Sequence, residues 1–314
     1  MTAEDNLENP DKTAVLLLAH GSPDSVEEVP EFLLRVTGGR PLPPPVVEEV
    51  KHRYGLIGRS PLTELTLKQA ELLAQELGLP VYVGMRNWKP FVADAVNAMT
   101  SDGVERVVAI CLAPQNSRTS VGLYRSALSD NEVSFSIDFV DSWHDHPLLI
   151  KAFAEKLRLG LDHARRQAGI QTVPIIFTAH SVPERTIAEG DPYESQAKET
   201  ASAVAREASL VPEDWNFAFQ SQGMSGAAWL GPRVEDTILG LKQKGHGELF
   251  IQPIGFLCDH VEVLYDIDIG FKQFAEQQGM RLWRAESLND SRLLASALAD
   301  ITRSRLARTA VAKK

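Results

Sequence analysis

Short runs of apolar residues, several of them uninterrupted, constrain this chain more than any other feature of its sequence. The clearest run, Ala14–Ala19, reads AVLLLA, and Val107–Leu112 is of the same kind. A strand with one face in water alternates apolar and polar residues, whereas a strand buried on both faces has no need to. These runs therefore predict parallel strands that are covered by helices on both faces.

Segments with the helical spacing of apolar residues alternate with the predicted strands. Further strands are expected at Val81–Met85, Ile137–Val140, Pro174–Thr178, Trp215–Phe219, Glu248–Ile254 and Arg281–Arg284. Helices are expected around the last of these strands and at Val26–Val36, Leu65–Leu77, Phe91–Met99, Ser120–Leu128, Pro147–Gln167, Tyr193–Ala208 and Val234–Lys244. The prolines at 41–45 should end the first helix. Such alternation is typical of the α/β class.

The alternating pattern occurs twice, and one long helix at Pro147–Gln167 joins the two series. A length of 314 residues suits two domains of about 150 residues each. We therefore predict two doubly wound domains, an N-terminal one at 13–165 and a C-terminal one at 166–306.

Composition excludes several classes of function. The net charge of −10 argues against binding to nucleic acids and against strong electrostatic docking on anionic lipid. No glycine-rich phosphate loop follows a predicted strand, so nucleotide binding is not expected. Cys111 and Cys258 are the two cysteines, too few for a disulfide framework or a zinc ribbon. Without a leader pattern or an apolar stretch of about 20 residues, we expect a cytoplasmic protein without a transmembrane segment.

Two segments far apart in the chain carry the polar residues that suit catalysis, FTAHSVP at 177–183 and CDHVEVLYDID at 258–268. Each follows a predicted strand, and in parallel sheets ligand sites collect at that end of the strands. The first segment places His180 on a tight loop just after its strand, with Pro183 and Gly190 keeping the loop from becoming helical. A neutral imidazole both ligates metal ions and accepts a proton near pH 7, so the two segments suggest a cleft that handles metal ions and protons.

The second segment begins a helix near Asp259, in which Glu262 and Asp266 are four residues apart and share one face. Like charges in that arrangement repel, which raises the pKa of at least one carboxyl and favours a proton relay. Asp259 is expected to cap the helix, and His260 to bond a neighbouring carboxylate. We expect Asp259, His260 and Asp266 to support the site rather than to bind metal themselves.

Several motifs in a fixed order give the chain a family resemblance. The segments FTAHSVPER, GDPYESQ, FQSQGMSGAAWLGPRVED and CDHVEVLYDIDI resemble those of the ferrochelatases, the iron-inserting enzymes of haem synthesis. In the N-terminal half the agreeing segments are RYGLIGRSPL, VYVGMRNWKP, LAPQNSRTS and SWHDHPLL. The resemblance extends from about residue 15 to residue 300. It implies Rossmann-like domains that face each other across a porphyrin cleft, with no organic cofactor.

The resemblance also implies roles for individual residues. His180 matches the cleft histidine of the family, a metal ligand or proton acceptor, and Glu262 matches its cleft glutamate. Many members carry a further acidic residue eight positions after that glutamate, where this chain has Gly270. The row of acidic side chains that begins at Glu262, here called the carboxylate track, is therefore shorter in this chain. His20, in AHGSP, takes the place of a residue on the cleft floor, where it would contact the metal or the product iron.

Arg53, Ser60 and Tyr124 match positions that surround the porphyrin propionates in the family, and arginine pairs with carboxylates through two hydrogen bonds. The loop before Ser60 is one residue shorter than is usual there. Arg118 is a further candidate donor. Trp229 is expected to serve the structure or the cleft wall, and the role of Trp88 is left open.

Iron is the expected metal substrate, and a porphyrin is its acceptor. No cysteine lies near the C-terminus, so an iron–sulfur cluster is not expected. The polar loop LAPQNSRTS favours coproporphyrin III over protoporphyrin IX. Two other interpretations stay open. One is a chelatase for another tetrapyrrole, such as cobalt into sirohydrochlorin, which the string AHGS supports. The other is a non-catalytic tetrapyrrole carrier, which retention of both His180 and Glu262 disfavours.

Overall fold

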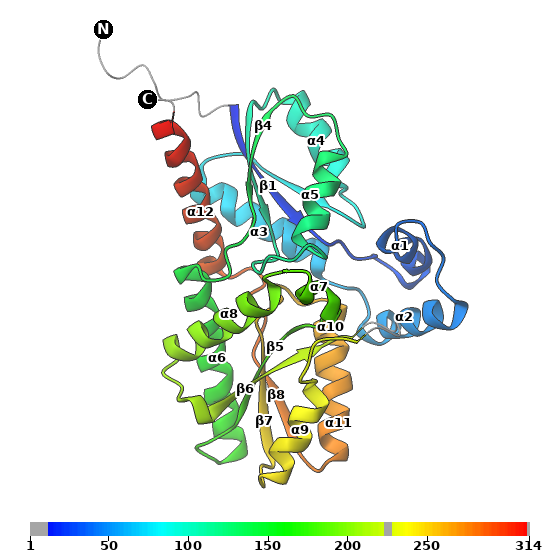
Figure 1. Cartoon of the computed structure of the whole chain (residues 1–314), viewed down its shortest axis with the longest axis vertical. Coiled ribbons are helices and arrows are strands. Elements are labelled where there is room, and N and C mark those ends of the chain that lie inside the picture. The colour runs from blue at the N-terminus through cyan, green and yellow to red at the C-terminus, as the bar shows by residue number, and fades with distance from the viewer. Residues whose placement is uncertain (1–11, 223–227, 313–314) are drawn as a thin grey trace.

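Two four-stranded parallel sheets form the framework of the molecule (Figure 1). The computed structural model describes residues 12–222 and 228–312. The first sheet has the order β2-β1-β3-β4 and is built from β1 (Thr13–Ala19), β2 (Val81–Met85), β3 (Arg106–Cys111) and β4 (Ser136–Val140). The second has the order β6-β5-β7-β8 and is built from β5 (Ile175–His180), β6 (Trp215–Gln220), β7 (Glu248–Pro253) and β8 (Arg281–Arg284). The predicted α/β class with parallel sheets is confirmed.

The apolar runs are buried on both faces of their sheet, as expected. Every residue of β1 is buried, and alternate side chains point to opposite faces. Val15 and Leu17 pack into a core cluster on one face, while Leu16 and Leu18 pack into a second cluster on the other. This two-sided burial explains why the run has no alternation of apolar and polar residues.

Helices cover both faces of each sheet. The helical segments of the N-terminal half are η2 (Val26–Glu28), α1 (Val29–Val36), α2 (Pro44–Ile57), α3 (Leu62–Leu77), α4 (Val92–Ser101) and α5 (Val121–Ser129). Those of the C-terminal half are α6 (Pro147–Ala168), α7 (Glu184–Ala188), α8 (Tyr193–Glu207), η3 (Pro212–Asp214), α9 (Val234–Gln243), α10 (Val261–Leu264), η4 (Asp266–Phe271), α11 (Lys272–Gln277) and α12 (Arg292–Ala312). The segment η4 is a π-helix.

Two helices lie where the sequence did not predict them. The prolines at 41–45 do separate α1 from the next helix, but Pro44 is the first residue of α2, a position at which proline removes no helical hydrogen bond. The short helix α7 lies between Pro183 and Gly190, where a non-helical loop was expected. Pro183 precedes its first turn with an extended backbone, and Gly190 comes after its end with a φ of +91°.

The N-terminal and C-terminal halves, each built on one sheet, share a hydrophobic core, and the last helix of the chain packs on both. The largest cluster of buried side chains contains residues of both sheets, among them Leu17 of β1 and Phe177 of β5. The final helix, α12, runs back beside the first sheet (Figure 1). Arg305 of α12 pairs with Asp138 of β4 at 3.2 Å. The proposed domain bounds of 13–165 and 166–306 stay a prediction, since α12 packs on both units.

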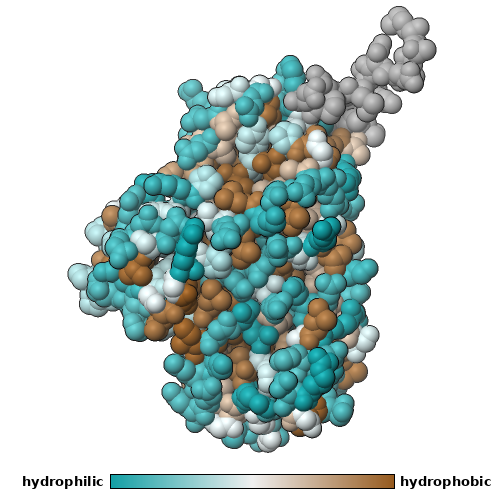
Figure 2. Space-filling view, turned by 180° about the vertical axis from the view of Figure 1, so that it is seen from behind, coloured by the Kyte–Doolittle hydropathy of each residue, from teal (hydrophilic) through white to brown (hydrophobic). Residues whose placement is uncertain are grey.

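The helices α1 and α2 form a lobe that projects from the side of the molecule (Figure 1). Its small core contains the rings of Phe32, Tyr54 and Trp88, and Phe32 meets each of the other two edge to face. On the face shown in Figure 2, apolar residues are interspersed among hydrophilic ones. None of the described helices combines the length and apolar character that crossing a bilayer requires.

The strand order fixes where a ligand site belongs. In each sheet the chain winds outward in opposite directions from two neighbouring strands, β1 and β3 in the first and β5 and β7 in the second. Loops that leave such a pair diverge and open a crevice at the carboxyl ends of the strands. His20 follows β1, His180 ends β5, and Glu262 lies in the segment after β7, so all three belong to these crevices.

Candidate active site

His180 is the last residue of β5, not a residue of the following loop as predicted. It extends the strand because it stays paired in register with Gln220 of β6. Its ring Nδ1 contacts the carbonyl oxygen of Ser181. That contact fixes the orientation of the ring and leaves Nε2 directed at Glu262, whose Oε1 lies 3.3 Å away.

Glu262 reaches this position from the short helix α10. Its backbone carbonyl accepts a hydrogen bond of 2.9 Å from Gln220, the strand partner of His180. A single glutamine side chain thus ties the helix to the strand pair that holds the imidazole. The second carboxylate oxygen of Glu262 lies 3.4 Å from Nε2 of His260. The predicted contact between His260 and a neighbouring carboxylate is confirmed.

The electrostatics of this pair result from its geometry. Burial disfavours a charge on His180, but the Glu262 carboxylate outweighs burial and raises the pKa of His180 to about 9. Burial likewise opposes the charge of Glu262, yet His180 and His260 hold its pKa well below the ordinary value. At neutral pH the two groups form an ion pair with about a third of each side chain exposed.

Asp266 continues the carboxylate track beyond Glu262. It opens the π-helix η4, receives a hydrogen bond from Ser221, and lies 3.6 Å from the Arg53 guanidinium. Burial, and secondarily the charge of Glu262, raises the pKa of Asp266. The predicted rise in the pKa of one of the two carboxyls is therefore found at Asp266.

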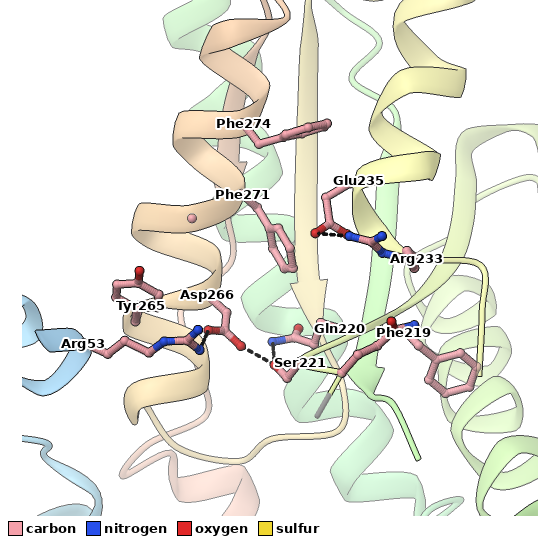
Figure 3. A pocket seen from close by; sticks show the side chains of 12 residues that line it. Arg53, Phe219, Gln220, Ser221, Arg233, Glu235, Tyr265, Asp266, Phe271 and Phe274 are labelled. Carbon is pink, nitrogen blue, oxygen red and sulfur yellow. Dashed lines mark hydrogen bonds and ion pairs between the residues drawn. The ribbon is translucent and has the colours of Figure 1, made fainter. Parts of the chain in front are cut away.

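The track ends at a pocket between the π-helix and β6 (Figure 3). Arg53, Ser221 and Asp266 lie together on one side, and Arg233 and Glu235, paired at 2.9 Å, lie on another. The pocket is lined by these residues and by Phe219, Gln220, Gln222, Tyr265, Gly270, Phe271 and Phe274. Gly270 therefore leaves open space where a carboxylate side chain would have extended the track.

His20 approaches the same region from the first unit. Its Nδ1 lies 3.0 Å from the carbonyl oxygen of Gly21. The other ring nitrogen, Nε2, is not engaged by that carbonyl. Water reaches His20, but partial desolvation by the surrounding protein, together with the charge of Arg86, holds its pKa below the ordinary value. The charges of Glu262 and His260 also act on its pKa.

Three imidazoles at the cleft are thus oriented in the same way. His20, His180 and His260 each place Nδ1 against a backbone carbonyl one or two residues away. A carbonyl can only accept, so this contact favours the proton on Nδ1 in a neutral ring and leaves Nε2 as the basic atom. Within the described residues, no three His, Cys, Asp or Glu side chains are grouped to hold a metal ion.

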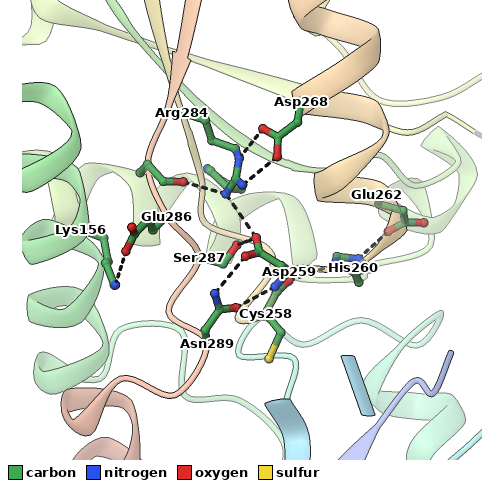
Figure 4. Close-up of polar contacts among 12 residues, drawn as sticks. Lys156, Cys258, Asp259, His260, Glu262, Asp268, Arg284, Glu286, Ser287 and Asn289 are labelled. Carbon is green, nitrogen blue, oxygen red and sulfur yellow. Dashed lines mark hydrogen bonds and ion pairs between the residues drawn. The ribbon is translucent and has the colours of Figure 1, made fainter. Parts of the chain in front are cut away.

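Asp259 does not cap α10, contrary to the prediction, because stronger donors engage it (Figure 4). The residue before α10 is His260, which makes no capping hydrogen bond with its side chain. The Asp259 carboxylate accepts hydrogen bonds from Ser287 at 2.7 Å and Asn289 at 2.9 Å, and lies 3.3 Å from Arg284. The aspartate anchors the start of the Glu262 segment to the chain after β8.

Arg284 completes that anchor, and sequence patterns gave no signal for it. From β8 its guanidinium donates to both carboxylate oxygens of Asp268 in η4, at 2.7 and 2.8 Å (Figure 4). It also reaches Asp259, so one arginine holds the chain on both sides of Glu262. The hydrogen bond by which Gln220 ties α10 to β6 was likewise not predicted from the sequence.

The predicted porphyrin-binding residues lie in different surroundings. Arg53 is on the wall of the pocket and bonds Glu49 at 2.8 Å. Ser60 and Tyr124 are buried, and the Ser60 hydroxyl has no partner within the described part of the chain. Arg118 pairs with Glu189 and donates to the Thr186 carbonyl at 3.1 Å, so it joins the loop after β3 to α7.

The two tryptophans contribute to the framework. Trp88 is a buried part of the core of the α1–α2 lobe. Trp229 forms an isolated bridge with Pro183, close to the chain of His180. Residues 223–227, in the middle of the predicted motif FQSQGMSGAAWLGPRVED, lie outside the described residues.

Comparison with known proteins identifies the family of the chain. The ferrochelatase family model matches residues 12–306. A ferrochelatase of Acidobacterium capsulatum is 54% identical, over 95% of this chain and 96% of its own. The coproporphyrin III ferrochelatase of Geobacillus sp. strain WCH70 is 34% identical, over 94% of this chain and 98% of its own.

Among solved structures, the sirohydrochlorin chelatase SirB of Bacillus subtilis in complex with cobalt matches with a TM-score of 0.59. The match covers 94% of this chain and 95% of that one, at 10% identity. At such low identity the likeness concerns the fold alone. The match to the family model and the 54% identity to a curated relative show more than the fold. The chain belongs to the ferrochelatase family.

Proposed function

We propose that this ferrochelatase, a metal-chelating lyase of haem biosynthesis, uses His180 and Glu262 to insert Fe²⁺ into its porphyrin. Insertion replaces two pyrrole N–H protons by the metal, so the site must accept protons where the ring nitrogens lie. The contact of 3.3 Å between Nε2 of His180 and Oε1 of Glu262 carries this assignment. A carboxylate that receives the imidazole proton frees Nε2 to take a proton from the pyrrole.

The released protons need a route to solvent, and Asp266 supports one. Burial, and secondarily the charge of Glu262, raises the pKa of Asp266, and the residue lines the pocket beside the π-helix. A proton passed from Glu262 to Asp266 reaches water there. In this proposal Gly270 does not interrupt the route, because water in the pocket takes the place of the missing carboxylate.

His20 is proposed to contact the iron from the opposite wall. Its Nδ1 is turned to a backbone carbonyl and its lowered pKa keeps the ring neutral, which is the state that ligates a metal. Fe²⁺ is a substrate of the reaction, bound transiently on its way into the macrocycle.

Coproporphyrin III is the proposed porphyrin. It carries four propionates, two more than protoporphyrin IX, and therefore requires more cationic partners. Arg53 and Arg233 both line the pocket next to the cleft. The 34% identity to a coproporphyrin III ferrochelatase supports the same substrate.

The proposed substrate is tested by mixing the purified protein with Fe²⁺ and each porphyrin in turn under anaerobic conditions. Absorbance of the metallated product gives kcat/KM. We expect a higher kcat/KM with coproporphyrin III than with protoporphyrin IX. A preference for protoporphyrin IX would overturn the substrate assignment, while absence of turnover with both would contradict the proposed chemistry.

A further inference from the structure

Ser221 turns its side chain to a face of the second sheet that a continuing strand would not give it. It follows Gln220, the last residue of β6. Side chains of a strand alternate between the two faces, and Ala218 packs in the cluster beside α10 and η4 whereas Phe219 packs in the cluster on the other face. Gln220 returns to the first face and contacts Glu262. A further extended residue would therefore point away from η4.

The backbone at Ser221 breaks this alternation. Its φ of +59° lies in the left-handed region, which glycine adopts freely and other residues seldom adopt. As a result, two consecutive side chains reach the same stretch of chain. Gln220 bonds the Glu262 carbonyl, and the Ser221 hydroxyl bonds the Asp266 carboxylate four residues later (Figure 3). A strained residue that is retained in this way points to a functional requirement.

The hydrogen bonds around the Ser221 hydroxyl have a definite direction. The side-chain amide of Gln220 donates to the Glu262 carbonyl at 2.9 Å and lies 3.3 Å from the Ser221 oxygen. An amide nitrogen can only donate, so the hydroxyl accepts from Gln220 and is left to donate its own proton to Asp266. Among the residues that the structure describes, this is the one hydrogen bond that the Asp266 carboxylate receives.

Asp266 lies between Ser221 and Arg53 in the pocket (Figure 3). Its Oδ2 accepts from the Ser221 hydroxyl, and its Oδ1 lies 3.6 Å from the Arg53 guanidinium. That guanidinium also bonds Glu49 at 2.8 Å, so its charge is shared between two carboxylates. Without the serine hydroxyl, Asp266 would keep only the longer contact with Arg53 and would no longer be held in one orientation.

We propose that Ser221 is a positioning residue that fixes the Asp266 carboxylate for proton transfer from Glu262. This inference rests on the proposed function, in which Asp266 receives that proton and passes it to water. A carboxylate already held in one orientation needs no rearrangement before it accepts a proton. The strained backbone at Ser221 allows two adjacent residues, Gln220 and Ser221, to hold both members of the relay.

Substitutions at Ser221 and Ser209 test the proposal, because the two serines share a φ of +59°. Ser209 is exposed just after α8 and serves as the matched control. Alanine at either position removes the hydroxyl and keeps the strain, glycine removes both, and Ser221→Thr keeps the hydroxyl. Urea unfolding gives stability, and porphyrin fluorescence without metal gives Kd. Stopped-flow absorbance with enzyme in excess over porphyrin gives the rate constant of iron insertion in a single turnover.

We expect Ser221→Ala and Ser221→Gly to slow insertion alike, by about 10-fold, as for the loss of one hydrogen bond to a charged group. Kd should not change, and Ser221→Thr should keep most of the rate. Ser221→Gly should unfold at a higher urea concentration than Ser221→Ala, because glycine relieves the strain. Ser209→Gly and Ser209→Ala should differ in stability in the same direction, and both should insert iron at the wild-type rate.

A wild-type rate in Ser221→Ala or Ser221→Gly would overturn the proposal, as would a Ser221→Thr protein that folds but is as slow as Ser221→Ala. Rates that follow stability, with Ser221→Gly faster than Ser221→Ala, would show a structural role instead. A raised Kd would assign Ser221 to porphyrin binding and likewise overturn the proposal. If wild type inserts no iron, the proposed function fails. If wild type inserts iron and the Ser221 variants match it, this inference fails alone.

Discussion

His180 and Glu262 shift each other's pKa in opposite directions across a contact of 3.3 Å. The pKa of His180 is raised to about 9, so the imidazole is protonated at neutral pH and must lose that proton before it accepts one. We therefore expect kcat/KM, which reports the free enzyme, to rise with pH through an apparent pKa above 6.5.

Replacing Glu262 by Gln removes the group that raises this pKa and leaves burial, which lowers it. The rising limb of the residual activity should therefore move to lower pH, while the maximal rate falls because a proton acceptor is lost. Glu276→Gln, an exposed change on α11, is the matched control and should leave the profile in place. If the rising limbs of the two pH profiles, wild type and Glu262→Gln, coincide, Glu262 does not raise the pKa of His180.

His180→Ala removes the proposed proton acceptor without removing a large part of the core. We expect iron insertion to fall by at least about 10²-fold, the lower range for general acid–base catalysis. Porphyrin binding, followed by fluorescence, should stay within a few-fold of wild type. His163→Ala, on the exposed side of α6, tests for effects of histidine loss in general. Robust turnover by His180→Ala would remove His180 from the mechanism.

Arg284→Met should destabilise the fold and disturb the site at once. It leaves the Asp259 and Asp268 carboxylates without their shared cation, at a cost of about 2–3 kcal/mol. Arg281→Met on the same strand breaks a more exposed pair with Glu248 and should cost at most about 1 kcal/mol.

Urea unfolding measures both free energies for these two variants. Because Arg284 holds the chain on both sides of Glu262, its loss should also lower kcat more than it raises KM. Equal unfolding free energies for the two variants would show that the Arg284 anchor does not stabilise the fold.

His20→Ala tests contact with the product iron. If Nε2 of His20 ligates iron, the visible absorption spectrum of the complex with ferric coproporphyrin III should change in this variant. His163→Ala, away from the cleft, should leave the spectrum of the complex as in wild type. Identical spectra for wild type and His20→Ala would assign His20 to the cleft wall alone.

Sequence patterns predicted the strands well because burial on two faces leaves a local signature. The predicted bounds of β2 agree with the structure at both ends, and β1 starts one residue earlier than expected. The helix α2 was missed because it buries a single side chain, Tyr54, and so lacks a strong apolar face. Its proline-rich start was interpreted as a break.

The sequence predicted those residues of the candidate site that lie close together in the chain. His180, Glu262 and Asp266 lie in two short segments, and the resemblance of those segments pointed to them. Asp259 was assigned a cap because its partners, Ser287 and Asn289, come some thirty residues later in the chain. The anchor by Arg284 could not be inferred either, because the fold alone brings it to Asp259 and Asp268.

The two sheets have the same strand order, since β6-β5-β7-β8 repeats β2-β1-β3-β4. Under this internal pseudo-symmetry β1 corresponds to β5, and the strings AHGSP and AHSVP, which contain His20 and His180, fall at equivalent ends. Both rings also turn Nδ1 to the carbonyl of the next residue. Under the proposed function, this repeated strand order directs one imidazole to each face of the porphyrin, with the Glu262 carboxylate on the side of His180.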